Sequence, residues 1–188
     1  MSNLKELTWE HHQNAERQDF VKVLMSGKMH PNFYATYLWN QHKKYDLMEA
    51  LASAHGLLDD LPIRRKMAIE QDFLELWDNK ENPPPIVPST ESYIDHMKTI
   101  MDDPDKLMAH IYVHHMGDLS GGQMIKRKIP GEGRMYQFEG DTKEIKEKIR
   151  TKIHDGMADE AKYAFTCATK LFQDLMEVDC EHYLGQVN

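Results

Sequence analysis

Cysteine is scarce in this sequence of 188 residues, since Cys167 and Cys180 are the only two. They do not form a Cys-x-x-Cys pair, which is the spacing found in many zinc and redox sites. Two isolated cysteines in a chain of this size indicate reduced thiols. Neither disulfide stabilisation nor a cysteine-based metal centre is therefore expected.

Long apolar segments are also missing. No run approaches the roughly 20 apolar residues that a membrane-spanning helix needs. The N-terminal sequence MSNLKELTWEHHQ has no apolar core of the kind found in signal peptides. We therefore expect a cytoplasmic protein that does not associate with a membrane.

The chain has no overall excess of basic residues. Its formal net charge of −8 argues for solubility and against general binding of nucleic acids. With 40% hydrophobic and 29% charged residues it is typical of soluble globular proteins, and its length suits a single domain over residues 1–188. Basic residues do cluster at 126–128 and 143–152, where a solvated helix face is an equally good interpretation.

Glycine and proline are few, at ten and eight residues, whereas residues that favour helices are common. Apolar residues recur at spacings of three and four, and no segment alternates convincingly with a period of two. We predict an all-α protein, a single-domain helical bundle, with an extended connector at Pro83-Pro84-Pro85. The expected helices cover residues 4–16, 18–26, 31–56, 62–77, 90–101, 104–128 and 157–176.

Three glycines lie inside the expected helix 104–128. Gly117 and Gly121 are four residues apart and share a face, and Gly122 follows them. Each costs about 0.5–1 kcal/mol relative to alanine in a helix, so their presence needs a reason. Two bare positions on one face let something flat and wide approach the backbone or let the helix bend. Close packing of another helix is the alternative.

Residues 119–123, LSGGQ, also match the signature loop of ABC-transporter ATPases. Those proteins need a phosphate-binding Gly-x-x-x-x-Gly-Lys-Ser/Thr motif, and this sequence contains none. The chain is also too short for that domain. The ATPase interpretation is therefore excluded.

A longer match includes the same glycines. Residues 117–123, GDLSGGQ, with Tyr112 ahead of them, resemble the distal-helix motif of the heme oxygenase family. Residues 8–16, TWEHHQNAE, resemble its proximal segment, in which a histidine is followed three and four residues later by Ala-Glu. The resemblance covers nearly the whole chain. It implies a bundle that holds heme b between a proximal helix, 4–16, and a distal helix, 104–128. The implied reaction uses O₂ and electrons to open heme at the α-meso carbon, which yields biliverdin, CO and Fe²⁺.

His12 is the expected ligand of the heme iron, because it occupies the histidine position of the proximal segment. Glu16 lies one helical turn further on and can orient the imidazole. Lys5, seven residues back, lies about 10.5 Å away along the helix axis, a sensible distance from the iron to the heme propionates. His11 points about 100° away from His12 and is the second choice.

The resemblance assigns further residues to the heme pocket. Gly117 and Gly121 would make room for oxygen and tilt it toward one meso carbon, and Tyr112 would line the pocket. Asp118 would hold a water network that supplies a proton, although a solvated helical carboxylate is the alternative for this residue.

Other positions would meet the edges of the heme. Lys146 and Arg150 share a helix face and resemble the family's pair of cations for the propionates. Phe165 and Phe172 match positions that line the pocket, although core packing is the safer interpretation for both.

Three departures from the family pattern affect these assignments. Trp9 stands where some relatives have a second lysine for the propionates, and His114 stands where arginine is common. The connection from Arg150 to Glu160 is several residues shorter than usual. The distal hydrogen-bond network and the positions of the propionate cations therefore remain open.

The resemblance also implies an electron donor. Soluble relatives in cyanobacteria and some of their phages take electrons from ferredoxin, and the basic residues at 126–128 and 143–152 suit such an acidic partner. A monomer is expected.

Two other functions are alternatives to the enzyme. A heme-binding module for storage or sensing would keep His12 but would not need Asp118. A di-iron carboxylate bundle needs paired Glu-x-x-His motifs, and no glutamate of this sequence has histidine three residues on.

Overall fold

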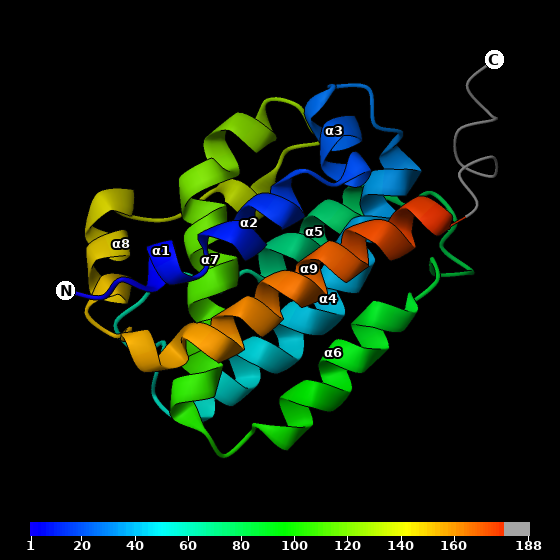
Figure 1. The fold of residues 1–188 in the computed structure, drawn as a ribbon. Helices are drawn as coiled ribbons and strands as arrows, with labels where there is room; N and C mark the ends of the chain where they lie inside the picture. The colour runs from blue at the N-terminus through cyan, green and yellow to red at the C-terminus, as the bar shows by residue number, and fades with distance from the viewer. Residues whose placement is uncertain (179–188) are drawn as a thin grey trace.

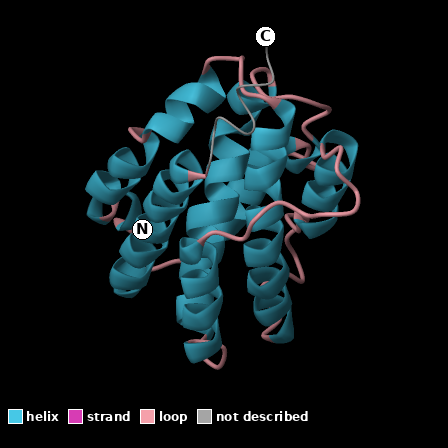
Figure 2. Cartoon of the chain, turned by 90° about the vertical axis from the view of Figure 1, so that its right-hand side faces the viewer, coloured by secondary structure: helices cyan, strands magenta, loops and turns pink. Residues whose placement is uncertain are grey.

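The structure, a computed structural model, describes residues 1–178, and its regular secondary structure in that range is helical (Figure 1). Figure 2 likewise shows helices and loops without a strand in the described chain, which confirms the predicted all-α class. The domain expected over 1–188 extends to residues 179–188, which include Cys180 and lie outside the described residues. The α-helices are α1 (Leu4–Leu7), α2 (Trp9–Glu16), α3 (Asp19–Met25), α4 (Pro31–Ala54), α5 (Lys66–Leu76), α6 (Pro88–Thr99), α7 (Pro104–Lys126), α8 (Thr142–Arg150) and α9 (Ala158–Glu177).

Helix α4 is the central helix of the bundle. It begins at Pro31, directly after His30, whose Nδ1 accepts a hydrogen bond from the backbone N–H of Asn32 at 3.1 Å. It ends just before Gly56, whose φ of +70° turns the chain away. Helices α5, α6 and α7 pack against it, which explains why even a lysine of α4, Lys44, is buried.

Helices α7 and α9 support the site. α7 begins at Pro104, and the side chain of Asp103 caps it by accepting a hydrogen bond from the backbone N–H of Lys106 at 3.1 Å. It remains helical through all three glycines as far as Lys126. α9 packs on α7 and also on α2 and α3, so the N-terminal helices are held to the bundle through α9 (Figure 1).

The helix predicted over residues 4–16 is divided in two. Thr8 separates α1 from α2, because its backbone has a φ of −107° and a ψ of 1°. Its hydroxyl donates a hydrogen bond to the carbonyl of Leu4 at 2.8 Å. A side chain that bonds to the preceding turn competes with regular helix geometry, and the chain changes direction here.

The helix predicted to begin at Pro62 was placed too early. α5 begins only at Lys66. The backbone N–H groups of Arg65 and Lys66 donate to the carboxylate of Glu49 at 2.7 and 3.0 Å, so α4 fixes the point at which α5 starts. This tertiary contact overrides the local preference for proline at a first helical turn.

The remaining boundaries follow the sequence closely. The chain is extended or irregular through the three prolines, and α6 begins at Pro88 rather than at Thr90. Two short 3-10 turns follow α7 and α8, at Arg134–Tyr136 and Asp155–Met157. None of the helices in residues 1–178 is both long enough and apolar enough to cross a membrane.

Candidate functional site

A cavity of about 870 Å³ lies between the N-terminal helices and α7. Helices α1 and α2 form one wall, α7 forms the opposite wall, and the segment after α8 closes a side. The lining residues are Met1, Ser2, Asn3, Lys5, Glu6, Trp9, His12, Tyr112, Val113, Met116, Gly117, Ser120, Arg150, Ile153, His154, Asp155 and Phe165. Among them are six residues that the sequence singles out for a site: Lys5, His12, Tyr112, Gly117, Arg150 and Phe165.

His12 lies on the wall formed by α2. Its ring stacks on Phe165 with centroids 5.1 Å apart and planes 11° apart, and it meets Trp9 edge-on at 5.4 Å. Its Nε2 lies 2.8 Å from Oε1 of Glu16, so the residue one turn further along α2 orients the ring. The side chain of His12 is 36% exposed, whereas His11 does not line the cavity. The geometry therefore offers an oriented, accessible imidazole at position 12.

The opposite wall contains a helix position without a side chain. A Cβ atom added to Gly117 would meet no other atom within 4 Å, so the space in front of this residue is open. Gly121 does not line the cavity, and a Cβ there would meet only Cδ1 of Ile125, at 3.7 Å. Gly122 is different, because a Cβ there would lie 2.8 Å from Cδ1 of Tyr136. One glycine thus opens the cavity, and another permits close packing.

Asp118 follows Gly117 but does not line the cavity. Its side chain lies toward α4, where Oδ2 accepts a hydrogen bond from the hydroxyl of Tyr45 at 2.6 Å. Burial raises the pKa of Asp118 to about 6, although the charge of His115 and the bond from Tyr45 oppose the shift. This carboxyl can therefore gain or lose a proton close to neutral pH.

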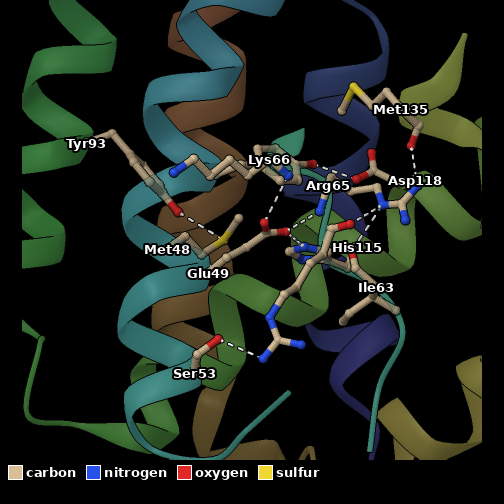
Figure 3. A network of polar contacts seen from close by, with 12 residues as sticks. Met48, Glu49, Ser53, Ile63, Arg65, Lys66, Tyr93, His115, Asp118 and Met135 are labelled. Carbon is tan, nitrogen blue, oxygen red and sulfur yellow. Dashed lines mark hydrogen bonds and ion pairs between the residues drawn. The ribbon is translucent and has the colours of Figure 1, made fainter. Parts of the chain in front are cut away.

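A buried polar network lies behind Asp118 (Figure 3). His115 places Nε2 2.7 Å from Oε2 of Glu49, the carboxylate that also accepts the backbone N–H groups at the start of α5. The guanidinium of Arg65 donates to the carbonyl of Gln137 at 2.6 Å. The network joins α4, α7 and the loop after α7. Sequence analysis missed it, although a glutamate on the long apolar helix 31–56 was a signal.

His114 occupies the position where arginine is common in the resembling family. It is buried, and its Nε2 lies 3.4 Å from the hydroxyl of Tyr93 on α6. Burial lowers the pKa of His114 well below its usual value, and the charge of Lys44 lowers it further. This protein therefore has a neutral imidazole at a position where the resembling family commonly has the permanent positive charge of arginine.

The cations expected to serve a propionate are only partly assembled at the cavity. Lys5 on α1 and Arg150 at the end of α8 both line it, and Arg150 also forms an ion pair with Glu147. Lys146, one turn before Arg150, is half-buried but is not among the lining residues. Two positive side chains therefore reach the cavity from different helices.

The two phenylalanines of α9 have different surroundings. Phe165 lines the cavity and stacks on His12, so it is not solely a core residue. Phe172 stacks on Phe20 with ring centroids 5.3 Å apart and planes 6° apart, and it also contacts Tyr37. It belongs to an aromatic part of the core.

Comparison with known proteins identifies the group to which this arrangement is similar. A family model described as Heme oxygenase matches residues 1–174. Heme oxygenase 1 of Synechocystis sp. is 29% identical over 200 residues, which cover 93% of this chain and 83% of that protein. Heme oxygenase 1 of Nostoc sp. is also 29% identical, over 87% of this chain and 80% of that protein.

Solved structures agree with the sequence comparison. Heme oxygenase-1 from Synechocystis sp. PCC6803, solved in complex with heme, matches with a TM-score of 0.79 and 26% identity over 98% of this chain and 97% of that one. Heme oxygenase-2 from the same cyanobacterium, solved with heme and NO, gives a TM-score of 0.81 and 26% identity over 93% of this chain and 84% of that one.

Proposed function

Because the chain belongs to the heme oxygenase family, whose reaction degrades heme to biliverdin, we propose that the cavity between α2 and α7 is where this reaction takes place. Its volume of about 870 Å³ falls within the range of about 300–1,000 Å³ typical of small-molecule sites. Family membership favours an enzyme over a heme-binding module for storage or sensing.

The residues around the cavity fit heme. A flat macrocycle needs two facing walls, an axial donor on one of them and free space on the other. His12 supplies the donor, and the open position at Gly117 supplies the space. The stacked ring of Phe165 adds an apolar edge. When bound, heme is both the substrate and the group that activates O₂.

We assign iron ligation to His12 and its orientation to Glu16. A ligating histidine usually bonds through its second ring nitrogen to a carboxylate or carbonyl, which fixes the ring and increases its basicity. Nε2 is the nitrogen on Glu16 here, so iron ligation by Nε2 requires the ring to turn and present Nδ1 to Glu16.

The charged and polar residues at the edges of the cavity would bind the rest of the substrate. Lys5 and Arg150 would neutralise the propionates, with Lys146 as a further cation one turn from Arg150. Tyr112 would position the macrocycle from the α7 wall.

We assign the supply of protons to Asp118. A carboxyl whose pKa lies near 6 exchanges protons readily at neutral pH, and the bond from Tyr45 fixes its orientation. Asp118 would act through water, because its side chain bonds toward α4 while its neighbour Gly117 borders the cavity. Gly117 would leave room for O₂ and direct it toward the α-meso carbon, the position implied by the motif at 117–123. Gly121 does not itself line the cavity and would only keep the next turn of α7 free of a side chain.

The electron donor that we propose is an acidic protein such as ferredoxin. Arg127 and Lys128 are exposed at the end of α7, and Lys143 is exposed at the start of α8. Such a basic patch on an otherwise acidic protein would steer a negatively charged partner. Since one chain supplies every wall of the cavity, we also propose a monomer, acting in the cytoplasm.

The assignment of His12 is tested by substitution. We expect the wild-type protein, incubated with heme, air and a chemical reductant, to lose the Soret band and gain biliverdin absorption. His12→Ala should lose normal heme ligation and form no biliverdin, whereas the neighbouring control His11→Ala should retain both.

Each result bears on a different part of the proposal. Heme that stays bound but is never degraded by the wild-type protein would indicate a storage or sensing module. An unchanged heme spectrum in His12→Ala would show that another residue ligates the iron.

A further inference from the structure

Three helices bring two histidines and a glutamate together on the side of the bundle where α6 and α9 meet. His96 comes from α6, His110 from α7 and Glu160 from α9. None of them lines the heme cavity. The Nε2 atoms of His96 and His110 lie 2.5 and 2.8 Å from the same oxygen, Oε1 of Glu160. These three donor atoms all lie within 4.8 Å of one another.

From this convergence we propose a second site, a binding site for a divalent first-row transition metal ligated by His96, His110 and Glu160. Two imidazoles with one carboxylate form a donor set that suits Zn²⁺, Co²⁺ or Fe²⁺ rather than the hard cations Mg²⁺ and Ca²⁺, which prefer oxygen ligands. The proposal does not depend on the roles assigned to the residues of the heme cavity.

The distances allow a metal to enter with little rearrangement. Bonds of about 2.0–2.2 Å in a tetrahedral site place neighbouring donors roughly 3.3 Å apart. The two Nε2–Oε1 separations of 2.5 and 2.8 Å would therefore open by less than about 1 Å. Rotations of the three side chains suffice for such a change, and water would fill the remaining position.

The surroundings of His110 match those of a metal ligand. Its other ring nitrogen, Nδ1, lies 2.9 Å from the hydroxyl of Tyr93, which fixes the plane of the ring. With a metal on Nε2, the Nδ1–H group would donate to that hydroxyl. Tyr93 could then donate its own proton to Sδ of Met48 at 3.6 Å or to Nε2 of His114 at 3.4 Å. No buried polar group would lose its partner through this rearrangement.

Access and ionisation are also suitable. The side chains of His96 and Glu160 are 23% and 13% exposed, while His110 is fully buried, so a metal would enter past His96. Burial lowers the pKa of His110, which keeps its imidazole neutral. Desolvation opposes ionisation of Glu160, but the hydrogen bonds from His110 and His96 outweigh it and lower the pKa of Glu160 to about 2. The carboxylate of Glu160 and the neutral imidazole of His110 are thus in the protonation states that bind a metal.

The test uses Co²⁺ as a spectroscopic probe of the heme-free enzyme. We expect one equivalent to bind with the d–d absorption of a low-coordinate Co²⁺, to be displaced by Zn²⁺ and to be unaffected by Mg²⁺. Glu160→Gln should weaken this binding more than tenfold. Glu70→Gln is the matched control, because Glu70 faces a single histidine, His42, at 3.8 Å and should leave the affinity unchanged.

A second variant guards against loss of folding. His96→Ala alters a partly exposed residue, so it should keep wild-type helicity and heme binding while losing the tight Co²⁺ site. The proposal is overturned if the wild-type protein binds no stoichiometric Co²⁺, if Mg²⁺ displaces it, or if Glu160→Gln and His96→Ala both bind it as tightly as the wild-type protein.

Discussion

At the scale of single residues, Asp118 is a buried carboxyl that lies next to the proposed heme cavity in the sequence and faces the interior of the bundle. It directly follows Gly117, which lines the cavity, but its own carboxyl is directed toward α4 by the bond from Tyr45. The desolvation that raises its pKa also makes the ionised form unfavourable in the folded protein. The proton-supplying role proposed for this residue would therefore have a cost in stability that depends on pH.

The sign of that cost follows from the raised pKa. Between about pH 4 and 6 the folded protein holds a proton on Asp118 that the unfolded chain has lost, so the contribution of this residue to stability falls as the pH rises through that window. Asp118→Asn should therefore increase the free energy of unfolding by about 1–3 kcal/mol at pH 7.5. The gain should vanish near pH 4.

Urea unfolding at several pH values measures this prediction. Asp95→Asn, at an exposed position on α6, is the control. A gain from Asp118→Asn that is the same at pH 4 and pH 7.5 would contradict the argument, because neutral packing effects do not depend on pH.

Residues of the candidate site can be predicted from the sequence more readily than the residues to which they bond. Asp118 and Gly117 stand in a contiguous motif, so they could be found by resemblance. Tyr45 lies 73 residues from Asp118, and Glu49 lies 66 residues from His115, so these pairs exist only once the helices have packed. A single sequence contains no local signal for contacts at such separations.

At the scale of elements, α7 contains three glycines, and the surroundings of each glycine differ. Gly117 faces open space, Gly121 is in ordinary contact with Ile125, and Gly122 accommodates the ring of Tyr136. The helix nevertheless continues to Lys126 without interruption, so the glycines neither end nor break it. Close packing, the alternative explanation for these glycines, thus applies to Gly122 and not to Gly117.

Alanine substitution should have opposite effects on stability at Gly117 and Gly122. Gly117→Ala meets no neighbour, so we expect an increase of about 0.5–1 kcal/mol in the free energy of unfolding, from helix propensity, together with slower biliverdin formation because the methyl group enters the cavity. Gly122→Ala should instead lower stability, by about 1–3 kcal/mol, because its methyl group collides with Tyr136.

Thermal unfolding and single-turnover assays of the two variants provide the measurement. If Gly117→Ala were destabilising, the position would not be free of neighbours. If the variant degraded heme at the wild-type rate, the open space at this position would have no role in the reaction.

The start and end signals of helices were reliable where neighbours did not interfere. Pro31 and Pro104 begin α4 and α7 as predicted, because proline fits a first turn that lacks N–H partners. The prediction failed at Pro62, where Glu49 binds the backbone that follows, and at Thr8, where a local side-chain bond divides the helix. Both failures come from hydrogen bonds that periodicity does not report.

At the scale of the whole molecule, charge is distributed unevenly. The net charge is −8, yet exposed basic residues lie at the end of α7 and along α8. Some of these cations are already paired, as Lys148 is with Glu144 and Lys152 with Asp60, which leaves the end of α7 as the stronger candidate for docking an acidic protein.

Neutralising the basic residues at the end of α7 should weaken docking of the electron donor without changing the degradation of heme itself. We expect the double variant Arg127→Gln, Lys128→Gln to lower kcat/KM with reduced ferredoxin about tenfold at low ionic strength. The difference should fade above about 0.1 M salt, where the Debye length is near 10 Å. Turnover with a small chemical reductant should be unchanged.

The control is the pair Lys98→Gln, Lys106→Gln, at exposed positions on α6 and α7 away from this end. Equal loss in both double variants, or none in either, would leave charge at the end of α7 without a role in donor docking.

The division of the first helix at Thr8 has a consequence for the cavity wall that contains His12. α1 has four residues and α2 eight, and helices shorter than about 12 residues are marginal in water without outside support. α9 gives that support on one face, and a rigid macrocycle seated on His12 would give it on the other. If the proposed site is correct, bound heme would stabilise α1 and α2, and opening of the macrocycle would weaken that support and favour release of the product.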